Sequence, residues 1–403
     1  MSATKETLLT GLVAFLLFAP LTGVSLDGYG LNPHWQNPFL LAGMAMLGRL
    51  LLVRLQGLRL PVGLAGYDWQ TRLQRPILAV VVIAALIFPW LVGKYWLNVA
   101  TLALIYVLLA LGLNIVVGLA GLLDLGFVAF YAVGAYFYAL TFKYLDLSFW
   151  IALPGGALLA GLCGMLLGFP VLRMHGDYLA IVTLGFGEIV RLVLNNWIDF
   201  TNGPNGVRAP FPSFFGLDFS RHPMPGKSSF HQFFHLSYSP IHKDIFLFIL
   251  LFFIVCGMVY FVRRLRRMPL GRAWEALRED EIACRALGIN HVTVKLSAFG
   301  IGAMTGGIGG AFFAASQGFV NPTSFTFMES AHILAIVVLG GMGSTAGVIA
   351  AAVILTFLPE ALRDFAEYRG LMFGCAMVMM MIWRPRGLLR SRRALFQREQ
   401  SAC

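Results

Sequence analysis

Ionisable and polar side chains inside apolar segments are the residues of this chain best suited to chemistry. Glu188 and Arg191 lie three positions apart in the apolar segment 178–194, so they can pair on one face of a helix. Asp124 opens another apolar segment, and Asn114 lies within a third. A charge at the centre of a bilayer costs about 2.5–3.5 kcal/mol on insertion scales, so it requires a partner or an aqueous cavity. Two interpretations stay open: a structural ion pair, or a gate on a solute path.

Motifs for catalysis, nucleotide binding and metal binding are incomplete. Residues 226–228 read Gly-Lys-Ser, like the end of a phosphate-binding loop, but Arg221 occupies the position of the first required glycine. His231 and His235 have the spacing of two metal ligands on a helix, but the sequence around them offers no third ligand. The cysteines are scattered without a CxxC pair. We therefore predict that the chain binds no metal or cofactor and catalyses nothing alone.

Small residues recur at every fourth position in two apolar segments. In 294–315 they are Ala298, Gly302, Gly306, Gly310 and Ala314, and in 149–169 they are Gly156, Ala160, Gly164 and Gly168. Such faces let helix backbones approach closely in a membrane, where lipid supplies no hydrophobic drive for association. The spacing therefore indicates either static helix packing or, for Gly302, Gly306 and Gly310, a wall without side chains along which a solute passes.

The elements that must position these residues are long apolar segments separated by short polar breaks. Only 12% of residues are charged and 58% are hydrophobic, and a helix that spans a bilayer needs about 20 apolar residues. The segments are 8–26, 39–53, 76–93, 97–117, 122–142, 149–169, 178–194, 245–262, 294–315, 329–357 and 370–383. Because the backbone in lipid must satisfy its own hydrogen bonds, we predict an all-α polytopic transmembrane bundle of about 10–12 membrane segments. Residues 340–343, Gly-Gly-Met-Gly, interrupt 329–357 and predict a helical hairpin or a re-entrant pair there.

The net charge of +11 is distributed as the positive-inside rule requires, so it does not indicate nucleic acid binding. Five arginines fall in 263–272, and further arginines lie in 54–75 and after 383. The long break 195–243 holds few basic residues for its length. Placing 263–272 in the cytoplasm puts 195–243 outside and predicts that both termini are cytoplasmic.

The stretch 268–290 differs from the other breaks because it is amphipathic. Pro269 and Gly288 bound it, and its apolar positions follow helical spacing. Those positions are Ala273, Trp274, Leu277, Cys284 and Leu287, and the charged residues between them are Glu275, Arg278, Glu279, Asp280, Glu281 and Arg285. We predict one short cytoplasmic helix, either a solvated connector or, as we favour, a docking helix for a cytosolic partner.

These residues resemble the LivM-type permeases, the membrane subunits of bacterial ABC importers for branched-chain amino acids. The run Gly-Arg-Ala-Trp-Glu-Ala-Leu-Arg-Glu-Asp at 271–280 is similar to the coupling helix of that family. Supporting stretches are 118–126 (GLAGLLDLG), 176–185 (GDYLAIVTLG), 201–206 (TNGPNG) and 339–344 (LGGMGS). The match covers about 97–385, and 1–93 is similar to an extra N-terminal region of many LivM subunits.

The resemblance implies three parts: an extension over 1–93 with about three membrane segments, a permease core over 94–390 and a basic tail over 391–403. It also implies an ATPase-coupling role for Ala273, Trp274, Glu275, Ala276, Leu277, Arg278, Glu279, Asp280, Ala283 and Gly288. The helix departs from the EAA-x3-G spacing of other ABC permeases, since Leu277 follows Glu275-Ala276 and the glycine comes at 288.

The function that the resemblance implies is import of leucine, isoleucine and valine across the bacterial inner membrane. It further implies a LivH-like second permease, two cytosolic ATP-binding cassettes that use the ATP, and a periplasmic amino-acid-binding protein. Two alternatives stay open. One is a urea or other small-solute permease of the same family. The other is an ion-coupled secondary transporter, for which Asp124 and Glu188 are the candidate coupling acids.

Overall fold

The computed structural model describes residues 24–27, 30–33, 85–171, 177–212 and 241–361, with the single positions 174, 239, 374, 378 and 387. The predicted segment 39–53, most of 8–26 and half of 76–93 lie outside the described residues. So do most of 370–383, the basic tail 391–403 and most of the external loop, with His231 and His235. The chain divides into two compact units, 1–85 with 359–372 and 86–358 with 373–403.

The smaller unit contains one described element, the antiparallel hairpin β1 (Val24–Asp27) and β2 (Gly30–Pro33). Its first strand includes residues 24–26, which the sequence assigned to the apolar helical segment 8–26. All other contacts described below belong to the larger unit.

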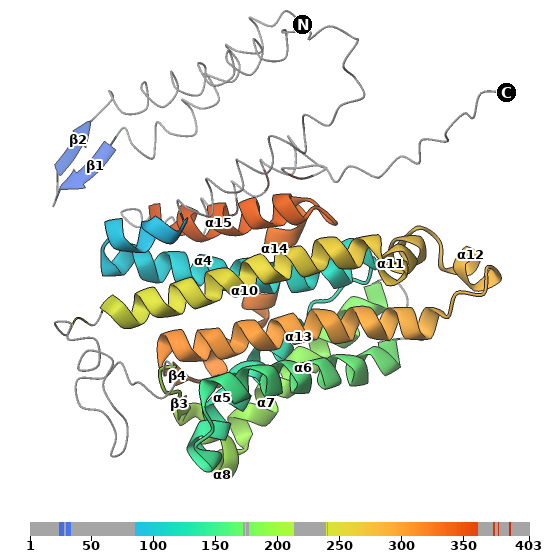
Figure 1. Ribbon diagram of the computed structural model, residues 1–403, viewed down its shortest axis with the longest axis horizontal. Coiled ribbons are helices and arrows are strands. Elements are labelled where there is room, and N and C mark those ends of the chain that lie inside the picture. Colours follow the sequence, from blue (N-terminus) through green and yellow to red (C-terminus); the bar gives the residue numbers. More distant parts are fainter. Residues whose placement is uncertain are drawn as a thin grey trace, which may run out of the picture. The chain divides into compact units, whose positions relative to one another are not determined.

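The larger unit is a bundle of apolar helices, which confirms the all-α prediction (Figure 1). Within the described residues, six helices are long and apolar enough to cross a membrane. The bundle comprises α4 (Lys94–Leu113), α5 (Val128–Leu145), α6 (Phe149–Val171), α7 (Asp177–Asn196), α10 (Ile241–Arg267), α13 (His291–Gln317), α14 (Phe327–Gly340) and α15 (Thr345–Ala361). The chain is therefore a polytopic membrane protein.

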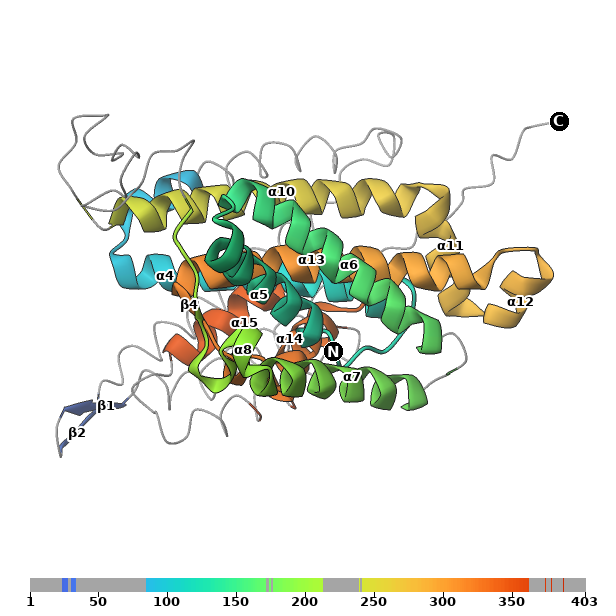
Figure 2. The same cartoon turned by 90° about the horizontal axis from the view of Figure 1, so that it is seen from below.

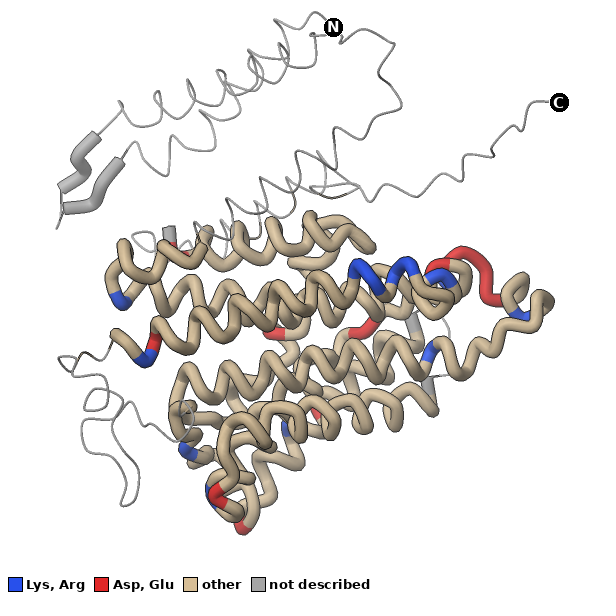
Figure 3. The backbone as a smooth tube through the Cα atoms, in the orientation of Figure 1, with Lys and Arg blue, Asp and Glu red and all other residues tan. Residues whose placement is uncertain are grey.

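Helix α13 is the centre of the bundle, and its most extensive contacts are with α6, α5 and α4. Figures 1 and 2 show α4, α10 and α13 running side by side. The end of α10 at Arg267 and the start of α13 at His291 lie at one end of the bundle, which we call the α11 end. Figure 3 shows basic positions of α10 at this end, near acidic positions of the connecting segment.

Short elements close the opposite end of the bundle. They are α8 (Ile198–Thr201), the 3-10 turns η3 (Gly203–Asn205) and η4 (Pro322–Ser324), and the strands β3 (Val207–Arg208) and β4 (Phe319–Val320). The two strands pair antiparallel, so the segment after α7 is fixed to the segment after α13.

The predicted segment 122–142 begins as a helix six residues late. Residues 120–127 are irregular, and α5 starts at Val128. The Asp124 carboxylate accepts a hydrogen bond from the Gly126 backbone N–H at 2.8 Å, which forms a local turn that competes with a helix. The Leu125 N–H donates to the Thr183 hydroxyl of α7 at 3.0 Å, which fixes the irregular segment to that helix.

The predicted interruption of 329–357 is confirmed. Helix α14 ends at Gly340, and α15 begins at Thr345. Between them Gly341 and Gly343 have positive φ angles of 99° and 84°, which only glycine adopts readily. The break lies at the α11 end, and α15 returns to the start of α4, where the Phe357 and Trp96 rings stack. Helices α14 and α15 thus turn back on each other, as the predicted interruption requires.

The stretch 268–290 is not one helix, and that prediction was wrong. It forms α11 (Pro269–Glu279) and α12 (Glu281–Ala286), with extended backbone at Asp280. The Asp280 carboxylate accepts hydrogen bonds from the N–H groups of Ile282 and Ala283, at 2.8 and 3.1 Å, as a helix N-cap does. Asp therefore starts a second helix, and Leu287, predicted on the apolar face, is 80% exposed.

Candidate functional site

Helix α11 is attached to the bundle through its tryptophan. The Trp274 side chain is fully buried, and its indole Nε1–H lies 3.0 Å from both the Val294 carbonyl and the Ser297 hydroxyl of α13. Leu277, one turn later, is also buried. A displacement of α11 would therefore act directly on the first turns of α13.

Two arginines connect α11 with neighbouring elements, one with the break between α14 and α15 and the other with the residues that follow α4. Arg266, at the end of α10, forms an ion pair with Glu275 of α11, with Nε and Oε1 2.6 Å apart. The same guanidinium donates through Nη1 to the Gly343 carbonyl at 3.1 Å. Arg278 donates through Nη1 to the Gly118 carbonyl. Glu275 and Arg278, which were both predicted as coupling residues, thus make contacts within this chain.

The residues after α4 that take part in these contacts form a single π-helical turn. Residues 114–119 form the turn η2 (Asn114–Leu119), which continues α4. The Asn114 side-chain Oδ1 accepts a hydrogen bond from the Gly343 N–H at 2.8 Å. π-Turns are rare and occur frequently at functional sites. The structure shows that Asn114 holds the α14–α15 break, and its role on a solute path stays a prediction.

A buried lysine completes the α11 end, and sequence reasoning missed it. The Lys295 side chain in α13 is only 2% exposed, and its Nζ lies 2.8 Å from the Glu281 carboxylate of α12. Arg285 pairs with the other oxygen of Glu281. Burial raises the pKa of Glu281, but the hydrogen bonds from Lys295 and Arg285 outweigh it and lower that pKa overall. The signal in the sequence was a lysine just inside an apolar segment.

A cavity of about 220 Å³ lies beside this ion pair. The irregular residues 120–123, Leu179 of α7, Arg278, Glu281 and Lys295 are among those that line it. The cavity separates α11 and α12 from the start of α7.

The remaining coupling positions differ in exposure. Glu279, Asp280, Ala283 and Gly288 are exposed, and Ala273 and Ala276 are half-buried. Gly288 follows α12 with a φ angle of +78°. One face of the α11–α12 unit thus contacts the bundle, and the other is open.

The predicted pair Glu188–Arg191 is present. Arg191 donates through Nε and Nη2 to one Glu188 oxygen, both at 2.8 Å, and the side chains are 33% and 34% exposed. Asp124, in contrast, is fully buried in its turn and does not join this pair. The structure therefore separates the two acids that the sequence grouped.

The glycine face of α13 is filled by neighbouring helices. Gly302 packs against Gly112 and Val116 of α4, and Gly310 packs against the Tyr131–Ala135 backbone of α5. Gly306 packs against the Phe127 and Phe130 side chains. These contacts support the packing role, and the role of this face as a solute path stays a prediction.

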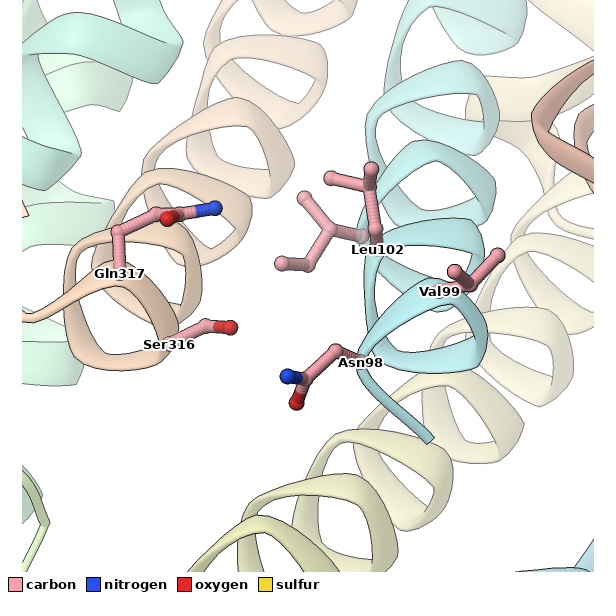
Figure 4. A pocket seen from close by; sticks show the side chains of 6 residues that line it. Asn98, Val99, Leu102, Ser316 and Gln317 are labelled. Carbon is pink, nitrogen blue, oxygen red and sulfur yellow. The ribbon is translucent and has the colours of Figure 1, made fainter. Parts of the chain in front are cut away.

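Two polar sites near α4 were not found from the sequence. The Tyr106 hydroxyl donates to the Glu329 carboxylate of α14 at 2.9 Å. At the opposite end from α11, a cavity of about 190 Å³ is lined by Asn98, Val99, Leu102, Ile105, Ser316 and Gln317. Figure 4 shows Ser316 and Gln317 of α13 directed toward the space beside Asn98 of α4. Both partners of each site are far apart in sequence, so no local pattern connects them.

The contacts at the α11 end connect α11 and α12 with several membrane elements. Among the described residues, no cluster of three His, Cys, Asp or Glu side chains could hold a metal ion. The bundle-facing side of α11 and α12 contacts α10, α13 and η2, and Arg266 of α10 extends these contacts to the α14–α15 break. A force applied at α11 therefore reaches four membrane elements.

Comparisons with known proteins agree with this arrangement. Residues 95–382 match the family model described as the permease component of branched-chain amino acid transport systems. The chain is 49% identical over 397 residues to the high-affinity branched-chain amino acid transport system permease LivM of Escherichia coli K12, covering 95% of this chain and 93% of that protein. It is 53% identical to LivM of Salmonella typhimurium over 328 residues, covering 81% of this chain and 77% of that protein.

A second group of relatives is more distant. The chain is 26% identical over 306 residues to the permease LivH of Salmonella typhimurium, covering 72% of this chain and 93% of that protein. No solved structure is significantly similar to this chain.

Proposed function

This chain belongs to the family of branched-chain amino acid transport system permease components, and we propose that it is the LivM-like membrane subunit of an ABC importer for leucine, isoleucine and valine. The observation that carries the proposal is the α11–α12 unit, which presents an open face on one side and contacts four membrane elements on the other. Such a unit suits a subunit that receives movement from an ATPase.

The partners follow from the same arrangement. Two cytosolic ATP-binding cassettes supply the hydrolysis, and one of them docks on the exposed face of α11 and α12. The second permease is LivH-like, because the LivH proteins share this chain's family pattern at 26% identity. A periplasmic amino-acid-binding protein delivers the solute. ATP acts only on the partner subunits, and this chain binds no cofactor.

The orientation places the α11 end in the cytoplasm of a bacterial inner membrane, with both termini on the same side. The arginines at the end of α10 support this orientation, because basic segments stay cytoplasmic. Ser148, between α5 and α6, then lies outside, and Glu279 lies inside.

Cysteine labelling tests the orientation. In a chain whose five native cysteines are replaced, we expect Ser148→Cys to react with an impermeant maleimide added to intact cells. Glu279→Cys should react only after the membrane is permeabilised. Both positions are exposed, so access to the reagent and not burial decides the result. Labelling of Glu279→Cys in intact cells would invert the topology.

Transport by the reconstituted complex tests the function. We expect proteoliposomes that hold this chain, the second permease and both cassettes to accumulate leucine only when ATP and the binding protein are supplied. The same vesicles should not accumulate urea. ATP-independent uptake by this chain alone in an ion gradient would instead assign it to secondary transporters.

A further inference from the structure

Helix α7 has an open face in the described structure. Its opposite face is attached to the bundle through Thr183 and through Gly187, which packs on Gly126. On the open face, Ile181 and Leu192 are exposed, and a Cβ added at Gly185 would meet no atom within 4 Å. The open face is therefore partly free of side chains near the middle of the helix.

The ion pair Glu188–Arg191 lies on this open side, next to Gly185. Each side chain is about one-third exposed, so the pair is not sealed inside the bundle. Charged side chains facing hydrocarbon are costly, so such residues line protein or aqueous surfaces. Helix α10 provides the contrast, because its exposed face near Phe253, Gly257 and Tyr260 is uncharged. The open face of α7 thus combines a charged pair with apolar side chains, whereas that part of α10 is uncharged.

The chemistry of the pair matches an amino acid. A free α-amino acid carries one ammonium and one carboxylate group on the same α-carbon. The Glu188 carboxylate can accept hydrogen bonds from an ammonium group, and the Arg191 guanidinium can bind a carboxylate through two parallel hydrogen bonds. Ile181 and Leu192 flank the pair and offer apolar surface for the side chain of the solute.

We propose that the face of α7 formed by Gly185, Glu188 and Arg191 borders the solute path, where Glu188 and Arg191 bind the ammonium and carboxylate groups of the passing amino acid. The inference rests on the proposed function and deepens it by assigning a solute-contacting site. When the solute leaves, the two side chains pair with each other again, so no charge stays uncompensated. Because Glu188 and Arg191 can pair either with the solute or with each other, the solute binds weakly enough to be released.

Two matched glycine variants test the path. Gly185 is half-buried and Gly257 is exposed, and a Cβ added at either position meets no atom within 4 Å in the described structure, so we expect the subunit fold to tolerate either substitution. In the reconstituted complex, we expect Gly185→Leu to lower ATP-driven leucine uptake at least about tenfold, because the side chain occupies the path. We expect Gly257→Leu to leave uptake unchanged. Equal uptake by both variants would overturn the proposal.

Charge variants test the binding role. We expect Glu188→Gln and Arg191→Gln each to lower uptake about tenfold, with the second permease still co-purifying and ATP still hydrolysed. The exchanged pair Glu188→Arg with Arg191→Glu restores a structural ion pair but reverses the positions that meet the solute, so uptake should stay low. Full recovery in the exchanged pair, or loss of the second permease in any variant, would assign the face to structure or subunit contact. Failure of the wild-type complex to transport would instead refute the proposed function.

Discussion

Replacing Arg278 with alanine is expected to lower ATP-driven leucine uptake at least about tenfold while the complex still assembles and hydrolyses ATP. The Arg278 guanidinium is the connection between α11 and the Gly118 carbonyl of the π-turn η2. That turn holds the α14–α15 break through the hydrogen bond between Asn114 and Gly343. Loss of the arginine should therefore separate movement of α11 from the membrane elements without disturbing the buried attachment at Trp274.

Uptake and ATP hydrolysis measured on the same vesicles separate this uncoupling from a folding defect. Arg264→Ala is the matched control, because it removes an exposed arginine near the end of α10 that contacts Tyr260 of its own helix. We expect the control to transport normally. Normal uptake by Arg278→Ala would show that coupling does not pass through η2.

Local sequence patterns predicted the features that depend on neighbouring residues. The spacing of Glu188 and Arg191 places them within one turn, and the pair forms at 2.8 Å. The glycines at 340–343 require a break in an apolar run, and α14 ends at Gly340. The apolar lengths themselves predicted the membrane helices, because the bilayer fixes the length that a spanning helix needs.

Features that depend on contacts between distant residues were not predictable. Gly343 and Asn114 are 229 positions apart, and Arg278 and Gly118 are 160 positions apart, so no periodicity joins them. The interruption of the amphipathic stretch at Asp280 was predictable in principle, because Asp is a strong N-cap. The apolar residues before and after Asp280 follow one continuous helical spacing, which is why a single helix was predicted.

The glycine face of α13, which we also call the glycine ladder, shows the same limit of prediction from local sequence. Its spacing identified the face, but not the elements that cover it. In the structure Gly302 packs against α4, and Gly310 packs against α5. Each glycine therefore has a different neighbour, and the consequence of a substitution depends on whether that neighbour is a side chain or a backbone.

Substituting leucine at Gly310 is expected to prevent assembly of the subunit. A Cβ at this position would overlap the Tyr131 carbonyl and the Ala135 N–H of α5, and backbone atoms of a packed helix cannot move aside individually. Overpacking in a core costs about 1–3 kcal/mol for a few methylenes, so even Gly310→Ala should lower the thermal unfolding temperature. Gly306→Leu should be less damaging for α5–α13 packing, because a Cβ there meets Phe130 at 3.1 Å and the movable Phe127 ring at 3.3 Å.

The amount of complex that co-purifies with the second permease, compared with leucine uptake, distinguishes packing from a solute path. We expect uptake by Gly306→Leu and Gly310→Leu to fall in proportion to assembled complex, since the ladder holds α13 against α4 and α5. Gly257→Leu, on the open face of α10, is the control and should assemble normally. A Gly306→Leu complex that assembles fully and hydrolyses ATP but does not transport would place this face on the solute path, because a blocked path leaves helix packing intact.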